Sequence, residues 1–117
     1  MTNEIACDIT KLSSEELKQV NNVAKEVFAN VTELKVLPNG YAMLFLETQE
    51  LFEKLSYIIK LNRACCPFLR QVLIADPYNG AIWLEFTGEK GVKEMLAMDL
   101  SGLLPKQFVD KLELLAV

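Results

Sequence analysis

The segment NRACCPFLR, residues 62–70, holds the side chains of this 117-residue sequence that are best suited to chemistry. Cys65 and Cys66 are adjacent, and two neighbouring thiols concentrate soft sulfur donors, which select copper(I), zinc, mercury(II) and similar ions. Basic side chains that are expected to stabilise thiolates flank the pair: Lys60, Arg63 and Arg70. The pair is therefore a candidate site for a soft metal or for thiol chemistry.

Cys7 is the third cysteine, and the sequence contains no histidine. The missing histidine excludes a Ser-His-Asp triad, a Cys-His pair and a histidine zinc ligand. Cys7 supplies a third sulfur if the N-terminal segment folds back across the helix that ends at the pair. Three sulfurs suit a trigonal soft metal better than tetrahedral zinc, which needs a fourth ligand. We take Cys7, Cys65 and Cys66 as candidate metal ligands and identify no catalytic set.

A second interpretation gives the adjacent cysteines no chemical role. Both continue the apolar side of the helix predicted before Pro67, and free cysteine is among the most buried residue types. The C-terminal end of a helix dipole also raises a thiol pKa, and the CxxC spacing is absent. An odd cysteine count argues against a disulfide framework. From the residues alone, both interpretations stay open.

Composition narrows the class of protein. The net charge of −4 argues against a nucleic-acid backbone or an anionic membrane as a partner, since both attract basic surfaces. No apolar run is long enough to span a bilayer, and the start MTNEIACDIT lacks the pattern of a signal peptide. We therefore expect a cytoplasmic protein with one domain over residues 1–117.

Local signals place the helices and strands. Ser13 as N-cap and Glu16 three residues later form a capping box. Apolar residues follow at helical spacing: Leu17, Val20, Ala24, Val27, Phe28 and Val31. Turn signals at 38–40 and 76–80 predict two hairpins, with strands at 34–37, 41–47, 69–75 and 81–87. Two helices complete the pattern, over 48–66, where Pro67 ends the helix, and over 88–98.

The chain therefore consists of a helix and two ββα units, over 31–66 and 67–98, followed by a tail over 99–117. The units align at an offset of 40 residues, which pairs Leu44 with Leu84 and Leu55 with Met95. One such unit cannot bury its own apolar face, but two can complete one sheet. The pattern predicts an α+β fold with a four-stranded, mainly antiparallel sheet and helices on one face. A short helix through Phe108, Val109, Leu112 and Leu115 is the expected form of the tail.

The sheet has a second apolar face in this scheme. Alternation groups Ile82, Leu84 and Phe86 with residues 42, 44 and 46, and puts an aromatic patch on the other side: Tyr41, Met43, Phe45 and Trp83. Something must cover that patch. The first helix or the tail of the same chain is one candidate, a homodimer packed sheet to sheet is a second, and a small-molecule groove, which no charged pair or glycine loop accompanies, is the third and weakest. The alternative function is therefore an interaction module that dimerises through this face or the apolar tail.

Three segments resemble a group of small, largely uncharacterised bacterial proteins. ACDIT, NRACCPFL and IWLEFTGEKGVKEML resemble segments of the ACxLT, ERxCCPF and IWLxITGPEGxKEFL types, over most of residues 5–96. The resemblance implies a cysteine at each of the three positions, and it implies no established activity. The chain departs from the pattern at Asn62, where the group has an acidic residue, and at Lys90, where it has proline. That departure puts a hard-ligand role at position 62 in doubt.

Overall fold

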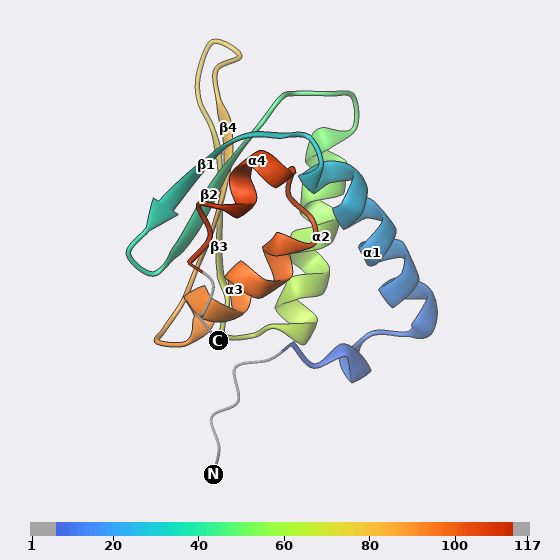
Figure 1. Ribbon diagram of the computed structural model, residues 1–117. Coiled ribbons are helices and arrows are strands. Elements are labelled where there is room, and N and C mark those ends of the chain that lie inside the picture. Colours follow the sequence, from blue (N-terminus) through green and yellow to red (C-terminus); the bar gives the residue numbers. More distant parts are fainter. Residues whose placement is uncertain (1–6, 114–117) are drawn as a thin grey trace.

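The structure, a computed structural model, describes residues 7–113 as a sheet with its helices packed against it (Figure 1). A short 3-10 helix, η1, precedes the first α-helix. The elements in chain order are η1 (Ile9–Lys11), α1 (Ser14–Phe28), β1 (Val31–Leu37), β2 (Gly40–Phe45), α2 (Leu51–Cys65), β3 (Arg70–Ala75), β4 (Ile82–Thr87), α3 (Val92–Ser101) and α4 (Lys106–Val109). None of the helices within residues 7–113 has both the length and the apolar character that a membrane crossing requires.

Local signals set the ends of the two long helices. The backbone N–H of Glu16 donates to the Ser13 hydroxyl oxygen at 3.0 Å, and the N–H of Ser13 donates to Glu16 Oε1 at 2.9 Å, which forms the predicted capping box. The spacing of apolar residues had placed Val31 in the helical stripe. The helix ends at Phe28, however, and Val31 is the first residue of β1. At the other helix, Cys65 is the last residue of α2 and Pro67 follows.

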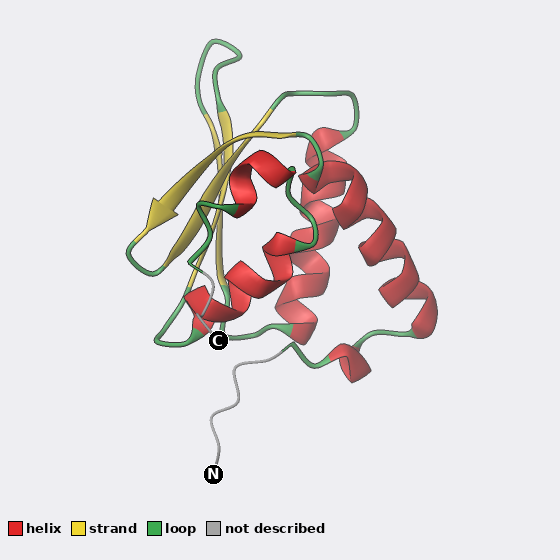
Figure 2. Cartoon of the chain, in the orientation of Figure 1, coloured by secondary structure: helices red, strands yellow, loops and turns green. Residues whose placement is uncertain are grey.

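The four strands form one antiparallel sheet in the order β1-β2-β4-β3. The helices all lie against the same side of this sheet (Figure 2). The predicted α+β class is therefore confirmed, including the N-terminal helix, the two hairpins and the helix after each hairpin. The second hairpin joins the first through the central pair, β2 and β4, so the two returning strands are neighbours.

The prediction of which residues of β2 and β4 share a face of the sheet is wrong. The register places Met43 opposite Leu84 and Tyr41 opposite Phe86, so these side chains share one face. All four are buried against the helices. Trp83 is instead opposite Leu44 and points to the uncovered face. The predicted aromatic patch therefore does not exist as a unit, because three of its members belong to the core and only Trp83 lies outside.

The same register corrects the internal repeat. Helix α2 begins at Leu51 and α3 begins at Val92, 41 residues later. With this offset Leu55 corresponds to Leu96, and both are buried, whereas Met95 is only partly buried. Odd-numbered residues of β2 lie opposite even-numbered residues of β4, and residues that lie opposite one another share a face of the sheet. Because side chains alternate between the faces with period 2, only an odd offset matches residues on the same face. The 40-residue offset aligns the turn residues of the two units, but it does not align their buried residues.

The C-terminal tail packs into the core. Leu104, Phe108 and Leu112 are buried, and α4 carries the second of them. The N–H of Glu113 donates to the Tyr41 hydroxyl oxygen at 2.7 Å, which gives this buried phenol a partner. A helix is confirmed over Lys106–Val109, but it ends before Leu112, which the prediction had included, and Leu115 lies outside the described residues. The described part of the tail, up to residue 113, is therefore packed rather than a free apolar surface, and it covers part of the sheet as the within-chain interpretation requires.

Candidate three-cysteine site

Two backbone features bring the three cysteines to one end of α2. The N–H of Cys66 donates to the Asn62 carbonyl at 2.6 Å as the last helical bond, and the Cys66 backbone, with φ −127° and ψ 67°, then turns the chain out of the helix. The N–H of Asp8 donates to the Cys65 carbonyl at 2.7 Å, and this bond holds the N-terminal segment across the helix end. The carbonyls of a last helical turn lack intrahelical partners, so this contact also caps the helix.

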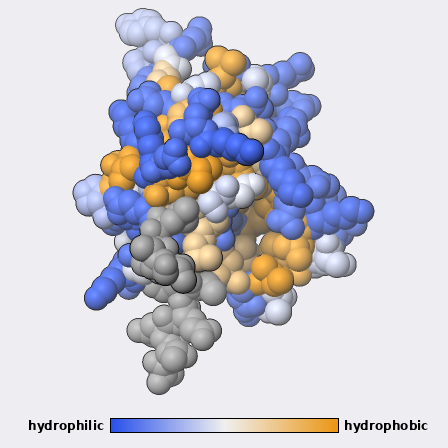
Figure 3. Space-filling model, viewed as in Figure 1, coloured by the Kyte–Doolittle hydropathy of each residue, from blue (hydrophilic) through white to orange (hydrophobic). Residues whose placement is uncertain are grey.

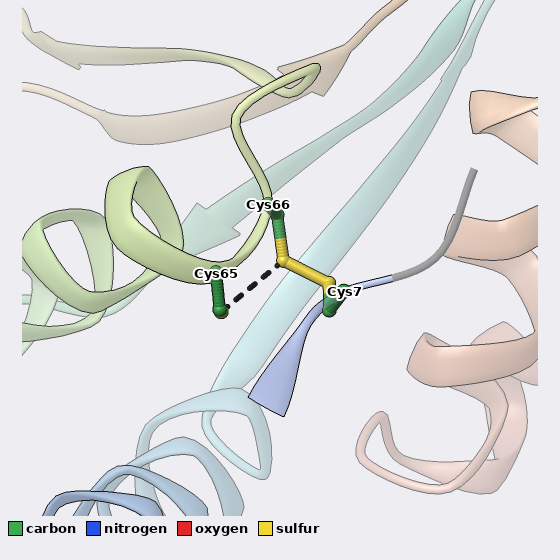
Figure 4. Close-up of side chains that lie close together, drawn as sticks. All are labelled: Cys7, Cys65 and Cys66. Carbon is green, nitrogen blue, oxygen red and sulfur yellow. Dashed lines mark hydrogen bonds between the residues drawn. A yellow bond between two sulfur atoms is a disulfide. The ribbon is translucent and has the colours of Figure 1, made fainter. Parts of the chain in front are cut away.

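The sulfur atoms form a tight cluster (Figure 4). Cys7 and Cys66 are joined by a disulfide, with Cα atoms 4.6 Å apart. The Sγ of Cys65 lies 3.4 Å from that of Cys66, and all three Sγ atoms lie within 4.8 Å of one another. The structure therefore brings together the three residues that the sequence proposed, including Cys7, which is 58 positions before Cys65.

The disulfide corrects one expectation. An odd cysteine count shows that one thiol must remain unpaired, but it does not prevent a single pair from forming. Here Cys65 is the free thiol and is buried. Sequence spacing could not select the partner, because the pairing depends on where the N-terminal segment crosses α2.

The electrostatics of the cluster also differ from expectation. Burial raises the pKa of the Cys65 thiol above its usual value, and the negative charge of Asp8 raises it further. Hydrogen bonds from Thr10 lower the pKa of Asp8, so that carboxylate stays charged beside the cluster. The basic residues that were expected to stabilise thiolates are instead exposed to solvent: Lys60, Arg63 and Arg70. Cys65 is thus held as a neutral thiol in the oxidised state.

A cavity of about 430 Å³ adjoins the cysteines between α1, α2 and α3. Its lining is mainly apolar and includes side chains from all three helices: Val20, Ala24, Ile58, Met95 and Leu96. Figure 3 shows this face hollowed between α3 and α1, with apolar side chains in orange at the rim. Sequence reasoning missed this cavity. The apolar stripe of α1 packs on the core only in its second half; its first half faces the hollow and is only half-buried.

Asn62 on α2 lies beside the cysteines, at the position where the resembling bacterial proteins have an acidic residue. Its Nδ2 donates to Gln71 Oε1 at 3.0 Å, and Gln71 Nε2 donates to the Ile59 carbonyl at 3.3 Å. The amide therefore ties α2 to β3 through a side chain that the sequence did not single out. Its hydrogen bonding is structural, and Asn62 is not needed as a metal ligand.

Neither a protein-family profile, nor a curated protein, nor a solved structure matches the chain. What the chain can do is therefore inferred from the geometry of the cysteine cluster and its surroundings.

Proposed function

We propose that the reduced protein binds one soft metal ion, copper(I) or mercury(II), through Cys7, Cys65 and Cys66. One observation carries this proposal: the sulfur atoms of the adjacent pair at the end of α2 and of Cys7, from the distant N-terminal segment, all lie within 4.8 Å of one another. Metal–sulfur bonds of about 2.3 Å place the sulfurs of a trigonal site roughly 4 Å apart. The cluster already has this size, and thiolates select soft ions.

The disulfide corresponds to the oxidised, metal-free form of the same site. The Cα atoms of Cys7 and Cys66 are 4.6 Å apart, so side-chain rotation after reduction can spread the sulfurs around an ion. Copper(I) accepts three thiolates, whereas zinc needs a fourth ligand. The described structure contains no carboxylate or histidine in the cluster that would supply one.

Two further points support the proposal. The resemblance to small bacterial proteins with ACxLT and ERxCCPF segments implies cysteines at all three positions. We also place the protein in the cytoplasm, where thiols are kept reduced and available as ligands.

Titration of fully reduced protein with copper(I), against a chromophoric chelator, is the direct test. We expect one ion per chain, and Cys65→Ser or Cys66→Ser should weaken binding about a hundredfold. That factor follows from roughly 3 kcal/mol per ligand, since four-ligand sites provide about 10–16 kcal/mol. Met98→Ser is the matched control, because Met98 is 66% exposed on α3 and is not one of the three clustered cysteines. Cysteine variants that keep the stoichiometry and the affinity of the parent protein would exclude the site.

A second candidate function is self-association through the uncovered face of the sheet. The register puts an apolar group on this face: Ala42, Leu44, Val72, Ile74 and Trp83. Glu33 and Glu85 share the face with Lys35 and Arg70, and Lys35 Nζ lies 4.4 Å from the centre of the Trp83 ring. Because the face carries charges of both signs around an apolar centre, two copies related by a two-fold axis can pair opposite charges.

Sedimentation at several protein concentrations tests this candidate. We expect a dimer at tens of micromolar, and Trp83→Glu should convert it to monomer by placing a charge in the apolar centre, as buried charges are costly. Tyr78→Glu is the matched aromatic control, since Tyr78 is fully exposed in the turn between β3 and β4. A monomer at every concentration would rule out the dimer and leave the metal site untouched.

A further inference from the structure

The first half of α1 presents an apolar stripe to a hollow. Leu17, Val20 and Ala24 are only half-buried, whereas Val27 and Phe28 at the end of the helix are fully buried. Leu12, just before the helix, also lines the cavity and is half-buried. An amphipathic helix normally buries such a stripe against its neighbours. Here the stripe forms one wall of a cavity whose volume lies in the range of small-ligand pockets.

Reactive sulfur atoms lie in the wall of this cavity. Cys7, Cys65 and Cys66 all contribute to its lining. In the oxidised protein Cys65 is the free thiol of the cluster, and it is buried, so its sulfur is shielded from reagents. The Cys7–Cys66 bond, in contrast, is a disulfide, which thiolates cleave, and its Cys7 end is only half-buried. A ligand suited to both features has a thiol at one end and an apolar body.

The charge of the cavity restricts the ligand further. Asp99 on α3 is the charged residue of the described lining, and it is exposed at the rim. No described residue makes a hydrogen bond or an ion pair with its side chain, although it lies among apolar residues. A carboxylate in this position repels anionic ligands, as like charges brought together are destabilising. Uncharged thiols are therefore favoured over acidic ones.

We propose that this cavity binds small, uncharged, apolar thiols and joins them to the protein as mixed disulfides. The thiolate of the ligand attacks Cys7 Sγ, the Cys7–Cys66 bond breaks, and Cys66 leaves as a thiolate that takes a proton from water. Cys7 is the favoured target, since it is half-buried whereas Cys66 is 2% exposed. The apolar body of the ligand then occupies the space between α1 and α3. This exchange does not depend on metal binding.

The test uses oxidised full-length protein and three thiols: benzyl mercaptan, 4-(mercaptomethyl)benzoate and 2-mercaptoethanol. Mixed disulfides are measured by mass spectrometry after an acid quench, and each rate is divided by the rate of the same thiol with a small soluble disulfide. We expect benzyl mercaptan to react about thirtyfold faster than 2-mercaptoethanol, the factor that burying one small aromatic group provides. The carboxylated thiol should lose about tenfold of this advantage. Peptide mapping should place the adduct on Cys7.

Two variants separate cavity binding from general reactivity. Ala24→Trp fills the cavity from α1 and should reduce the preference for benzyl mercaptan to less than about threefold. Met98→Trp adds the same side chain at an exposed position on α3 and should retain the preference. Asp99→Asn should accelerate the carboxylated thiol about fivefold without affecting the neutral one, and this exposed substitution remains informative if Ala24→Trp fails to fold. Equal normalised rates for the three thiols, or equal effects of the two tryptophans, would overturn the proposal.

Discussion

Reduction of the Cys7–Cys66 bond is expected to increase the affinity for copper(I) by at least about a thousandfold. In the oxidised protein two of the three sulfurs are bonded to each other, which leaves Cys65 as the free thiol of the cluster. Losing two ligands at roughly 3 kcal/mol each removes most of the binding free energy of a small thiolate site. Burial of the remaining thiol weakens it further as a ligand, because the metal binds the thiolate.

Copper(I) competition titrations on matched oxidised and reduced samples measure this difference. Mass spectrometry establishes the redox state of each sample before titration. Cys7→Ser is the control, because it cannot form the bond and its weaker affinity should be the same before and after mild oxidation. If the oxidised parent protein binds copper(I) as tightly as the reduced one, the cluster is not the site of binding.

Met43→Ala is expected to destabilise the fold by about 3 kcal/mol, and Leu44→Ala by less than about 1.5 kcal/mol. The two residues are neighbours on β2, but Met43 is fully buried against the helices and Leu44 is half-buried on the uncovered face. Truncating a core side chain removes its burial and leaves a cavity, which together cost about 2–5 kcal/mol. A half-buried side chain loses only part of its burial term.

Urea denaturation followed by far-ultraviolet circular dichroism gives both free energies of unfolding. The comparison is internally controlled, since the two substitutions lie in one strand and have similar propensity effects. A larger loss at Leu44 than at Met43 would mean that the sheet faces are inverted relative to the structure. In that case the aromatic patch first expected on the second face would be restored.

The helices and strands could be predicted because their signals are local. The capping box at Ser13, the turn before Gly40 and the stop at Pro67 each act within a few residues. The faces of the sheet could not be predicted in the same way. They depend on how β2 and β4 pair, and a shift of the pairing register by one residue exchanges the two faces. Both faces of β2 are apolar in sequence, so hydrophobic alternation did not decide between them.

The cysteines of the candidate site could be identified from the sequence, but their bonding and surroundings could not. Adjacent thiols at Cys65 and Cys66 are visible in the sequence. The fold-back of Cys7 was only the condition for a third sulfur, and the structure fulfils that condition. The disulfide, the opposing charge of Asp8 and the cavity beside the cluster were not foreseen. All three depend on where the segment before α1 crosses the end of α2, which is a long-range property of the packing.

The bond between Cys7 and Cys66 also has a consequence for folding, since it joins positions 59 residues apart. A cross-link over a loop of this length removes unfolded-chain entropy equivalent to about 4 kcal/mol. The total stability of a small domain is only about 5–15 kcal/mol. A metal ion held by the same sulfurs closes the same loop. The reduced, metal-free chain is therefore the least stable of the three states and the one most exposed to proteolysis, so cellular abundance would itself report whether the cluster is filled or oxidised.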